Sequence, residues 1–314
     1  MNYAIFVMML YNSALEAIGH TPLIRLNRIA DEDSAEIYVK YEAVNIGASI
    51  KTRTAYGMIE DAEEKGLLNE NSLIVECTSG NQGIALAMIG AVKGYRVIIV
   101  MPDSVSVERR KLIEMYGAQV RLVHDEGNIG ECIKKCQQIV ENSAKQDPFV
   151  FVPGQFDNPA NVMAQRQTGE EIVADLKQID GFVSGFGTGG TISGIGEVLK
   201  EKNPDVEIWV AEPENAAILS GKEISSHLQM GIGDGVIPKI MNQDIYDEIC
   251  IVTDEEAIAT SKLLAKKEGL LCGISSGTNV AAALKLAKKL GKGKKVVTIC
   301  PDTGERYYST PLFD

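Results

Sequence analysis

The chain has 314 residues, 45% of them hydrophobic and 24% charged, which is typical of a soluble globular protein with about two domains. Its formal net charge of −12 argues against a nucleic-acid partner, because neutralising phosphates requires clustered lysine and arginine. The negative charge also disfavours an anionic membrane surface, so we interpret the acidity as a solubility feature.

The opening residues 1–10 are apolar but resemble neither a signal peptide nor a membrane span. They lack a basic region and a small-residue cleavage site, and the run is too short to cross a bilayer. We interpret them as an overlong start, with Met8 or Met9 as the true initiator, or as an arm that packs on a partner subunit.

The six cysteines are scattered and lie mostly in apolar, strand-like runs. This distribution is typical of small buried side chains and not of a disulfide framework, which indicates a cytoplasmic protein. Cys132 and Cys136 are spaced to share one helix face, but the chain has only three histidines and none is nearby. The sequence therefore predicts no metal site.

From residue 36 onward, short runs rich in β-branched residues alternate with helical patterns. Such alternation predicts an α/β fold with a parallel sheet and helices on both of its faces. Thr253 and Glu256 form a capping box that predicts the start of one helix. Strands are predicted at 37–41, 73–75, 96–101, 119–123, 149–152, 181–184, 207–211, 248–252 and 295–299. Helices are predicted at 49–65, 82–93, 106–116, 128–144, 161–176, 191–202, 254–268 and 279–290.

Two connections between these elements stand out. The stretch 153–159 is the best candidate for a domain junction, because proline and glycine interrupt regular structure there. Residues 213–245 form a long glycine-rich connection with no clear period. Loops of that length inside a compact domain are usually functional.

The segment Gly185-Phe-Gly-Thr-Gly-Gly-Thr191 follows a predicted strand and opens a predicted helix. Its glycines allow backbone N–H groups to converge on an anion, and Thr188 and Thr191 add hydroxyl donors. Tight packing of the helix on the strand explains the glycines about equally well. The segment is not a P-loop, because no lysine follows the glycines, and it departs from the dinucleotide-binding pattern.

Three further segments begin or precede helices. Asn45-Ile-Gly-Ala-Ser-Ile-Lys51 places a lysine in a first turn, where the helix dipole disfavours a cation. Such a lysine is usually a solvated side chain, but a lowered lysine pKa is what Schiff-base chemistry requires. Thr78-Ser-Gly-Asn-Gln82 suits a carboxylate, or simply caps its helix. Gly273-Ile-Ser-Ser-Gly277 precedes the helix predicted at 279–290.

In this order, the four segments resemble the cysteine synthase family, also called O-acetylserine sulfhydrylases, among the fold-type II pyridoxal-phosphate enzymes. The resemblance runs from Ile18 to Asp314. It implies two three-layer αβα domains with mostly parallel sheets, like tryptophan synthase β: a smaller mobile domain at 50–153 and a larger cofactor-binding domain at 1–49 plus 154–314. Further matches are Met101-Pro-Asp, Glu108-Arg-Arg-Lys111, Gln155-Phe-Asp-Asn-Pro-Ala-Asn161, Glu212-Pro, Gly269-Leu-Leu and Pro301-Asp-Thr-Gly-Glu-Arg-Tyr-Tyr-Ser-Thr310.

The resemblance also implies roles for individual residues. Lys51 would carry pyridoxal 5'-phosphate as a Schiff base and move the proton at the substrate Cα. Asn81 would bond the cofactor's ring hydroxyl, and Ser275, or its neighbour Ser276, would face the pyridine nitrogen. The phosphate would be held by Gly187, Thr188, Gly189, Gly190 and Thr191. The substrate would be held by Thr78, Ser79, Gly80, Gln82, Gln155 and Asp234, and the catalytic candidates are Lys51, Asp234 and Ser79.

A neutral hydroxyl at the pyridine nitrogen makes the cofactor a weaker electron sink than a carboxylate would. Loss of a leaving group from Cβ is then favoured over transamination, so that α-aminoacrylate is the expected intermediate, to which a nucleophile adds.

The chain departs from the family pattern at several positions: Ile46 replaces a proline, Thr52 an aspartate, Cys77 a proline and Gln82 a threonine. In Gly231-Ile-Gly-Asp-Gly235, the family usually has a small apolar residue where this chain has Asp234. That carboxylate either points at the substrate Cβ or turns to solvent in a glycine-rich turn. If it points inward, it repels hydrosulfide and accepts a proton from water as a general base.

The leading hypothesis is β-replacement on cysteine or an activated serine, with a lean towards cysteine plus water giving serine and hydrogen sulfide. The enzyme alternatives are a cysteine synthase using O-acetylserine and sulfide, a cystathionine β-synthase-like condensation, and a serine or threonine deaminase. An inactive regulatory homologue is the non-enzyme alternative, against which Lys51 and the intact phosphate loop argue. From the resemblance we also expect a homodimer. We expect no tight serine acetyltransferase complex, because Asp234 would repel the C-terminal carboxylate that this partner inserts.

Overall fold

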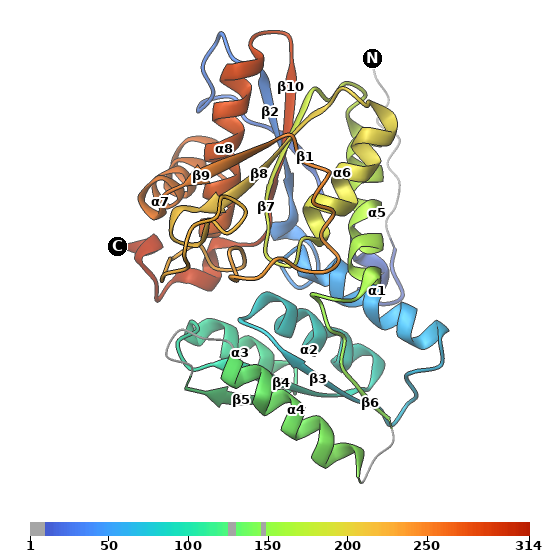
Figure 1. The fold of residues 1–314 in the computed structure, drawn as a ribbon. Helices are drawn as coiled ribbons and strands as arrows, with labels where there is room; N and C mark the ends of the chain where they lie inside the picture. The colour runs from blue at the N-terminus through green and yellow to red at the C-terminus, as the bar shows by residue number, and fades with distance from the viewer. Residues whose placement is uncertain (1–9, 125–129, 146–148) are drawn as a thin grey trace.

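The computed structural model describes residues 10–124, 130–145 and 149–314 (Figure 1). The interpretation of residues 1–9 as an overlong start or an arm lies outside the described residues, as do the first residues of the helix predicted at 128–144. Within the described ranges, no helix is both long and apolar enough to cross a membrane.

The larger sheet has six strands in the order β1-β2-β10-β7-β8-β9. All neighbours run parallel except β1 and β2, which pair antiparallel with Ile24 opposite Val39. The sequence did not predict β1, because a strand of three residues is too short to show a period. The strands are β1 (Leu23–Arg25), β2 (Glu36–Tyr41), β7 (Gly181–Gly185), β8 (Glu207–Pro213), β9 (Glu248–Val252) and β10 (Lys295–Cys300).

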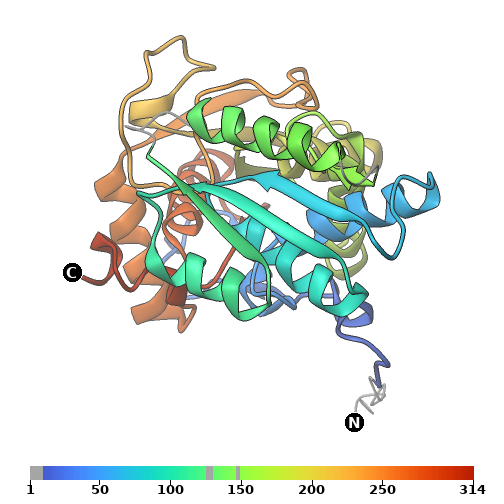
Figure 2. The same ribbon diagram turned by 90° about the horizontal axis from the view of Figure 1, so that it is seen from below.

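The smaller sheet has four parallel strands in the order β5-β4-β3-β6. They are β3 (Leu73–Cys77), β4 (Arg96–Pro102), β5 (Gln119–Val123) and β6 (Val150–Phe151). All four come from the segment that the sequence assigns to a smaller domain. The sheet lies below the larger one in Figure 1, and the view from below shows its strands in front (Figure 2).

The helices are α1 (Lys51–Glu64), α2 (Asn81–Lys93), α3 (Val107–Met115), α4 (Gly130–Ala144), α5 (Pro159–Asp175), α6 (Gly190–Lys202), α7 (Asp254–Leu263) and α8 (Ile274–Leu290). A π-helical turn at Leu264–Glu268 extends α7. The helix predicted at 279–290 begins earlier, at Ile274, because Gly273 is extended and acts as its N-cap. The Ser-Ser-Gly stretch, which the sequence places before the helix, is therefore in the first turn of a buried helix.

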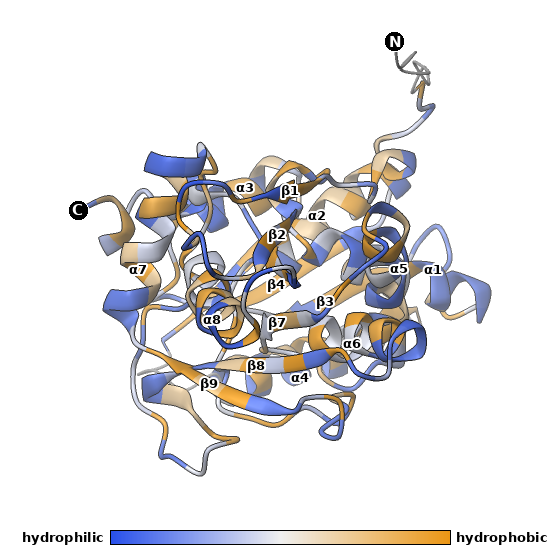
Figure 3. Ribbon diagram, turned by 90° about the horizontal axis from the view of Figure 1, so that it is seen from above, coloured by the Kyte–Doolittle hydropathy of each residue, from blue (hydrophilic) through white to orange (hydrophobic). Residues whose placement is uncertain are grey.

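Each sheet is the middle of three layers, as the sequence predicts. Val183 packs with residues of α7 and α8 on one face of the larger sheet, whereas Phe182 packs with α5 and α6 on the other. In the smaller sheet, Ile74 packs with α1, α2 and α3, and Val75 packs with α4. This alternation follows from the two-residue period of a strand. Hydrophobic residues accordingly concentrate in the strands and on the helix faces that cover them (Figure 3).

Two smaller predictions are also confirmed. All six cysteine side chains are buried. The Thr253 hydroxyl accepts a hydrogen bond of 3.1 Å from the Glu256 N–H, which is the expected cap of α7. Among the described residues, no group of three or more histidine, cysteine or acidic side chains is arranged to hold a metal ion.

The topology directs the ends of several parallel strands to one place. The loops after β3, β7 and β10 contribute Thr78, Phe186 and Pro301 to a single pocket. Open α/β sheets commonly bind ligands outside the carboxyl ends of their strands. Helix α1 packs against both α2 and α5 and so joins the two sheets beside this pocket.

Candidate active site

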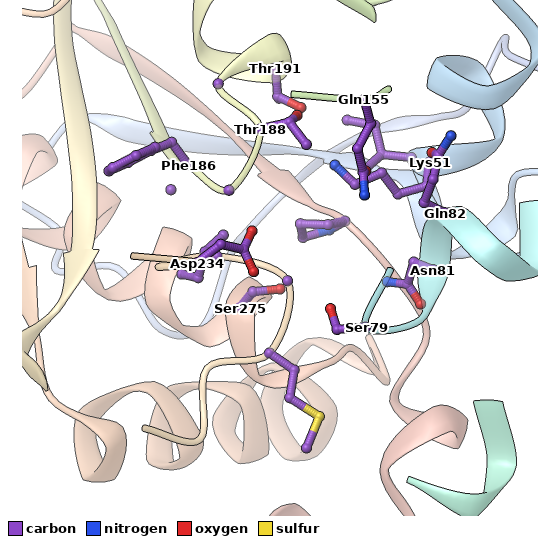
Figure 4. Close-up of a pocket in the computed structure, with 18 of the residues that line it drawn as sticks. Lys51, Ser79, Asn81, Gln82, Gln155, Phe186, Thr188, Thr191, Asp234 and Ser275 are labelled. Atoms are coloured by element: carbon purple, nitrogen blue, oxygen red, sulfur yellow. The ribbon is translucent and has the colours of Figure 1, made fainter. Parts of the chain in front are cut away.

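The pocket between the two sheets has an empty volume of about 910 Å³, including space open to solvent at its mouth. It brings together most of the residues that the sequence analysis selected (Figure 4). The selected residues that line it are Lys51, Thr78, Ser79, Asn81, Gln82, Gln155, Gly187, Thr188, Gly189, Thr191, Asp234 and Ser275. Gly80 and Gly190 do not line it, but they belong to the backbone of the two loops that do.

Lys51 is the first residue of α1, and its side chain faces the pocket. The preceding Ile50 donates its N–H to the Pro301 carbonyl at 2.8 Å, so the end of β10 fixes where the helix starts. Burial lowers the pKa of the Lys51 amine, while the negative charge of Asp234 partly opposes this shift. The result is an amine that is more readily deprotonated than an ordinary lysine, as an amine nucleophile requires.

The glycine-rich loop forms an anion-binding turn at the start of α6. Gly189 is the N-cap and has a φ of 77°, in the left-handed region that favours glycine. A Cβ at Gly190 would lie 2.2 Å from Asn161 Oδ1, so the position has no room for a side chain. Thr188 Oγ1 accepts a hydrogen bond of 3.0 Å from Asn161 Nδ2, which holds the turn against α5. The N-terminus of α6 thereby meets the pocket and suits a phosphate group.

The loop after β3 places the N-terminus of α2 on the opposite wall. Thr78 is buried, and its hydroxyl accepts a hydrogen bond of 3.2 Å from the Gly80 N–H. Gln82 is buried with neither amide atom paired within the described part of the chain, although it lines the pocket. Because an unpaired buried amide is costly, these atoms indicate a wall shaped to receive a polar ligand.

Gln155 belongs to the segment that the sequence marked as a domain junction. Its backbone carbonyl accepts a hydrogen bond of 2.8 Å from Asn161 Nδ2. The preceding Gly154 donates its N–H to Glu76 Oε2 at 3.1 Å. Burial raises the pKa of Glu76 to about 7, and hydrogen bonds from backbone N–H groups partly oppose the shift. These contacts connect the segment to β3 and place the Gln155 side chain in the pocket.

Asp234 lies on the long connection after β8 and faces the same pocket. Its Oδ2 is 2.8 Å from the position that a Cβ on Gly187 would take, so the carboxylate sits directly against the glycine-rich loop. By accessible surface, Asp234 and Lys51 are half-buried, and both line the cavity. Burial raises the pKa of Asp234, and the positive charges of Lys51 and His227 partly oppose this. The structure therefore turns this side chain towards the cavity that Lys51 also lines.

Ser275 also faces the pocket, whereas Ser276 is fully buried with its hydroxyl unpaired in the described structure. Sequence reasoning missed Asn279, one turn further along α8. Its Oδ1 accepts the Gly185 N–H at 2.7 Å and its Nδ2 donates to the Ile299 carbonyl at 2.8 Å, so it ties the ends of β7 and β10 together. The sequence also gave no role to Arg109 and Met230, which line the pocket. Arg109 had one signal, its place in the matching Glu108–Lys111 segment, and Met230 had none.

These features fit pyridoxal phosphate. The pocket offers a half-buried lysine of lowered pKa, a helix N-terminus for a phosphate, an amide and a hydroxyl for the ring, and unpaired polar atoms for a substrate. Such a constellation defines an enzyme of the fold-type II pyridoxal-phosphate class.

Comparisons with known proteins agree. Residues 14–302 match the family model described as "Pyridoxal-phosphate dependent enzyme". A "Cysteine synthase" of Staphylococcus aureus is 45% identical over 301 residues, covering 95% of this chain and 96% of the relative. The chain therefore belongs to the cysteine synthase family of pyridoxal-phosphate-dependent enzymes, and its cofactor is pyridoxal phosphate.

Two solved structures of similar proteins carry other activities in their names. The crystal structure of O-ureido-L-serine synthase has a TM-score of 0.91 and 44% identity, covering 98% of this chain and 96% of that one. The crystal structure of a hydrogen sulfide-producing enzyme from Fusobacterium nucleatum has a TM-score of 0.90 and 41% identity, covering 95% of this chain and 100% of that one. Membership of the family thus leaves the nucleophile and the leaving group open.

Proposed function

We propose that this enzyme converts cysteine and water into serine and hydrogen sulfide by β-replacement. The observation that carries the proposal is the carboxylate of Asp234, which faces the same cavity as Lys51 and has no hydrogen-bond donor among the described residues. Such a carboxylate is available to a ligand. In a family member specialised for sulfide, a carboxylate at this position would be a disadvantage, because its negative charge would repel an incoming hydrosulfide.

Binding comes first in the proposed reaction. The substrate carboxylate lies at the N-terminus of α2, against the hydroxyls of Thr78 and Ser79 and the amide of Gln155. The phosphate loop holds the cofactor at the N-terminus of α6. With both ends fixed, the substrate Cβ is directed towards the side of the cavity where Asp234 lies.

Proton transfers follow. Bound pyridoxal phosphate supplies the electron sink that allows a group to leave from Cβ. Lys51 removes the Cα proton and later returns it. The C–S bond breaks, the sulfur leaves as hydrosulfide, and a water oxygen then bonds to Cβ. Asp234 accepts the proton that this water gives up and then releases it, and the hydrosulfide takes up one proton. Overall, one cysteine and one water give one serine and one hydrogen sulfide.

The similarity to the hydrogen sulfide-producing enzyme supports this direction. A second candidate is synthesis of cysteine from O-acetylserine and sulfide, favoured by the similarity to the cysteine synthase of Staphylococcus aureus. The two reactions share the binding residues and Lys51, and differ only in leaving group and nucleophile.

Product analysis separates the candidates. The purified protein with bound cofactor is given cysteine alone in oxygen-labelled water, and separately O-acetylserine with sulfide. We expect equal amounts of sulfide and labelled serine from cysteine. Cysteine from the second mixture, with no serine from the first, would favour the second candidate. Pyruvate and ammonia in place of serine would instead indicate elimination without replacement.

A further inference from the structure

Asn81 lies between an acid and a base from the C-terminal segment that follows β10. Its Nδ2 donates to Asp302 Oδ2 at 2.7 Å, and its Oδ1 accepts from Arg306 Nη1 at 2.7 Å. Asn81 begins α2, on the side of the smaller sheet, whereas Asp302 and Arg306 follow the larger sheet. We call Asp302 and Arg306 the amide clamp.

The clamp determines which way round the Asn81 amide lies. A carboxylate only accepts hydrogen bonds, so the atom facing Asp302 must be the nitrogen. A guanidinium only donates, so the atom facing Arg306 must be the oxygen. The two partners independently require the same orientation. An amide nitrogen carries two hydrogens, and the second has no partner among the described residues, while Asn81 lines the active-site pocket.

The clamp residues are themselves held in place. Asp302 is fully buried, and its Oδ2 also accepts the Tyr307 hydroxyl at 2.8 Å. Burial raises the pKa of the Tyr307 phenol, as does the charge of Asp302, so the phenol remains a donor. Arg306 Nη2 donates to the Gly47 carbonyl. Asp302 and Arg306 therefore each have a second anchor, which limits their freedom to rotate.

The same C-terminal segment bonds to α3, on the side of the smaller sheet. Ser106 Oγ donates to the Arg306 carbonyl at 3.1 Å, and the Arg109 guanidinium lies 4.7 Å from the centre of the Tyr307 ring. The orientation of Asn81 therefore depends on contacts that span both sheets.

We propose that Asp302 and Arg306 are positioning residues that make Asn81 present a hydrogen-bond donor, and not an acceptor, to the ring oxygen of the cofactor. This rests on the contact between Asn81 and that oxygen, which the family resemblance implies and which we include in the proposed function. A donor stabilises the ionised ring oxygen, whereas the carbonyl of a flipped amide would repel it. The clamp thereby sets the ionisation of the bound cofactor without touching it.

The test compares the absorbance of bound pyridoxal phosphate across pH in Asp302→Asn, Asn81→Ala and the double variant. The amide introduced by Asp302→Asn can present either its oxygen or its nitrogen to Asn81, so the fixed orientation is lost. We expect the long-wavelength, ionised form to give way to the short-wavelength form in both single variants, with the midpoint shifted by about one pH unit, a tenfold change in the equilibrium. The double variant should match Asn81→Ala alone, because both changes act through one hydrogen bond. Arg306→Lys should give a smaller shift in the same direction.

Glu305→Gln is the matched control, since Glu305 is exposed on the same segment and lies outside the clamp. A shift equal to that of Asp302→Asn in this control would overturn the proposal. The proposal would also be overturned if the midpoint shifts in Asn81→Ala but stays at the parent value in Asp302→Asn. Asn81 would then contact the cofactor without needing the clamp. A parent-like midpoint in Asn81→Ala would remove the contact and the clamp together. Circular dichroism and the affinity of each apoprotein for pyridoxal phosphate separate these results from misfolding. If the parent protein makes no serine, the proposed reaction is refuted but the clamp is not.

Discussion

Arg53 binds Glu171 through two parallel hydrogen bonds, Nη1 to Oε1 at 2.6 Å and Nη2 to Oε2 at 2.7 Å. Arg53 is in the first turn of α1, beside Lys51, and Glu171 is on α5. Arg53 Nε also pairs with Glu42 at 3.0 Å, and Lys40 pairs with Glu171 at 2.8 Å. This buried network fixes the turn of the helix that carries Lys51.

Glu171→Gln should therefore destabilise the protein at neutral pH. Burial alone would raise the pKa of Glu171, but hydrogen bonds and charge from Arg53 and Lys40 bring it down to about 2 from 4.5. A pKa lowered by folding gives stability that is present above pH 4.5 and is lost as the pH falls towards 2. The difference between a pKa of 4.5 and one of about 2 corresponds to about 3 kcal/mol in the free energy of unfolding. Urea unfolding at several pH values should show that Glu171→Gln is less stable than the parent near neutral pH. In acid, the two free energies of unfolding should become equal.

The neighbouring Glu170→Gln is the control, because Glu170 is exposed on the same helix. It should change the free energy of unfolding by less than about 0.5 kcal/mol. Equal stability of Glu171→Gln and the parent at neutral pH would contradict a stabilising role for the network.

Gly190→Ala should weaken cofactor binding. The added Cβ would lie 2.2 Å from Asn161 Oδ1, so the turn must open or Asn161 must leave Thr188 and the Gln155 carbonyl. Either change displaces the N–H groups that meet the phosphate. We expect at least about a tenfold loss of affinity, which corresponds to the loss of one charge-assisted hydrogen bond. Fluorescence titration of the apoprotein with pyridoxal phosphate measures it. Lys202→Ala, at the exposed far end of the same helix, should bind like the parent.

Much of this architecture could be predicted because it rests on local periodicity. Strand runs such as 181–184 alternate with helices, and glycine-rich segments at strand ends show where ligands approach. β1 escaped prediction because three residues acquire their structure only from pairing with β2. The orientation of Asp234 depends on how a long connection folds back on the glycine-rich loop, which no local pattern encodes.

The remaining site residues were missed for a related reason. Asn279 acts by joining the ends of two strands, and Arg306 acts on Asn81 from more than two hundred positions away in sequence. Polar residues of this kind carry no period, and their partners become visible only when the chain is folded. The choice between Ser275 and Ser276 likewise needed the helix, since adjacent helical residues point in different directions.

Lys51→Ala should abolish the covalent link to the cofactor and nearly all turnover. Alanine has no amine to form the bond, and the first turn of α1 keeps its anchors at Ile50 and Arg53. Borohydride treatment followed by mass spectrometry should add the reduced cofactor to the parent and not to the variant, while circular dichroism stays unchanged. Lys65→Ala, exposed at the end of the same helix, should retain the adduct. A borohydride-stable adduct on the Lys51 variant would assign the link to another lysine.

Asp234→Asn tests the choice of reaction. Asparagine keeps the size and polarity of the side chain but cannot accept a proton from water, and one general base contributes about 10²–10⁴-fold. In a single turnover, we expect each active site to release one sulfide from cysteine at a rate within about tenfold of the parent, while serine formation falls by that larger factor. Because the base must be ionised and burial raises the pKa of Asp234, serine formation by the parent should decline as the pH falls through that pKa. The variant should lack this acid limb. Asp157 is an exposed carboxylate that lines a second groove together with Asp234. The control variant Asp157→Asn should keep the parent's rate and pH profile. Serine production by Asp234→Asn at the parent rate would remove the basis for preferring water over sulfide as the nucleophile.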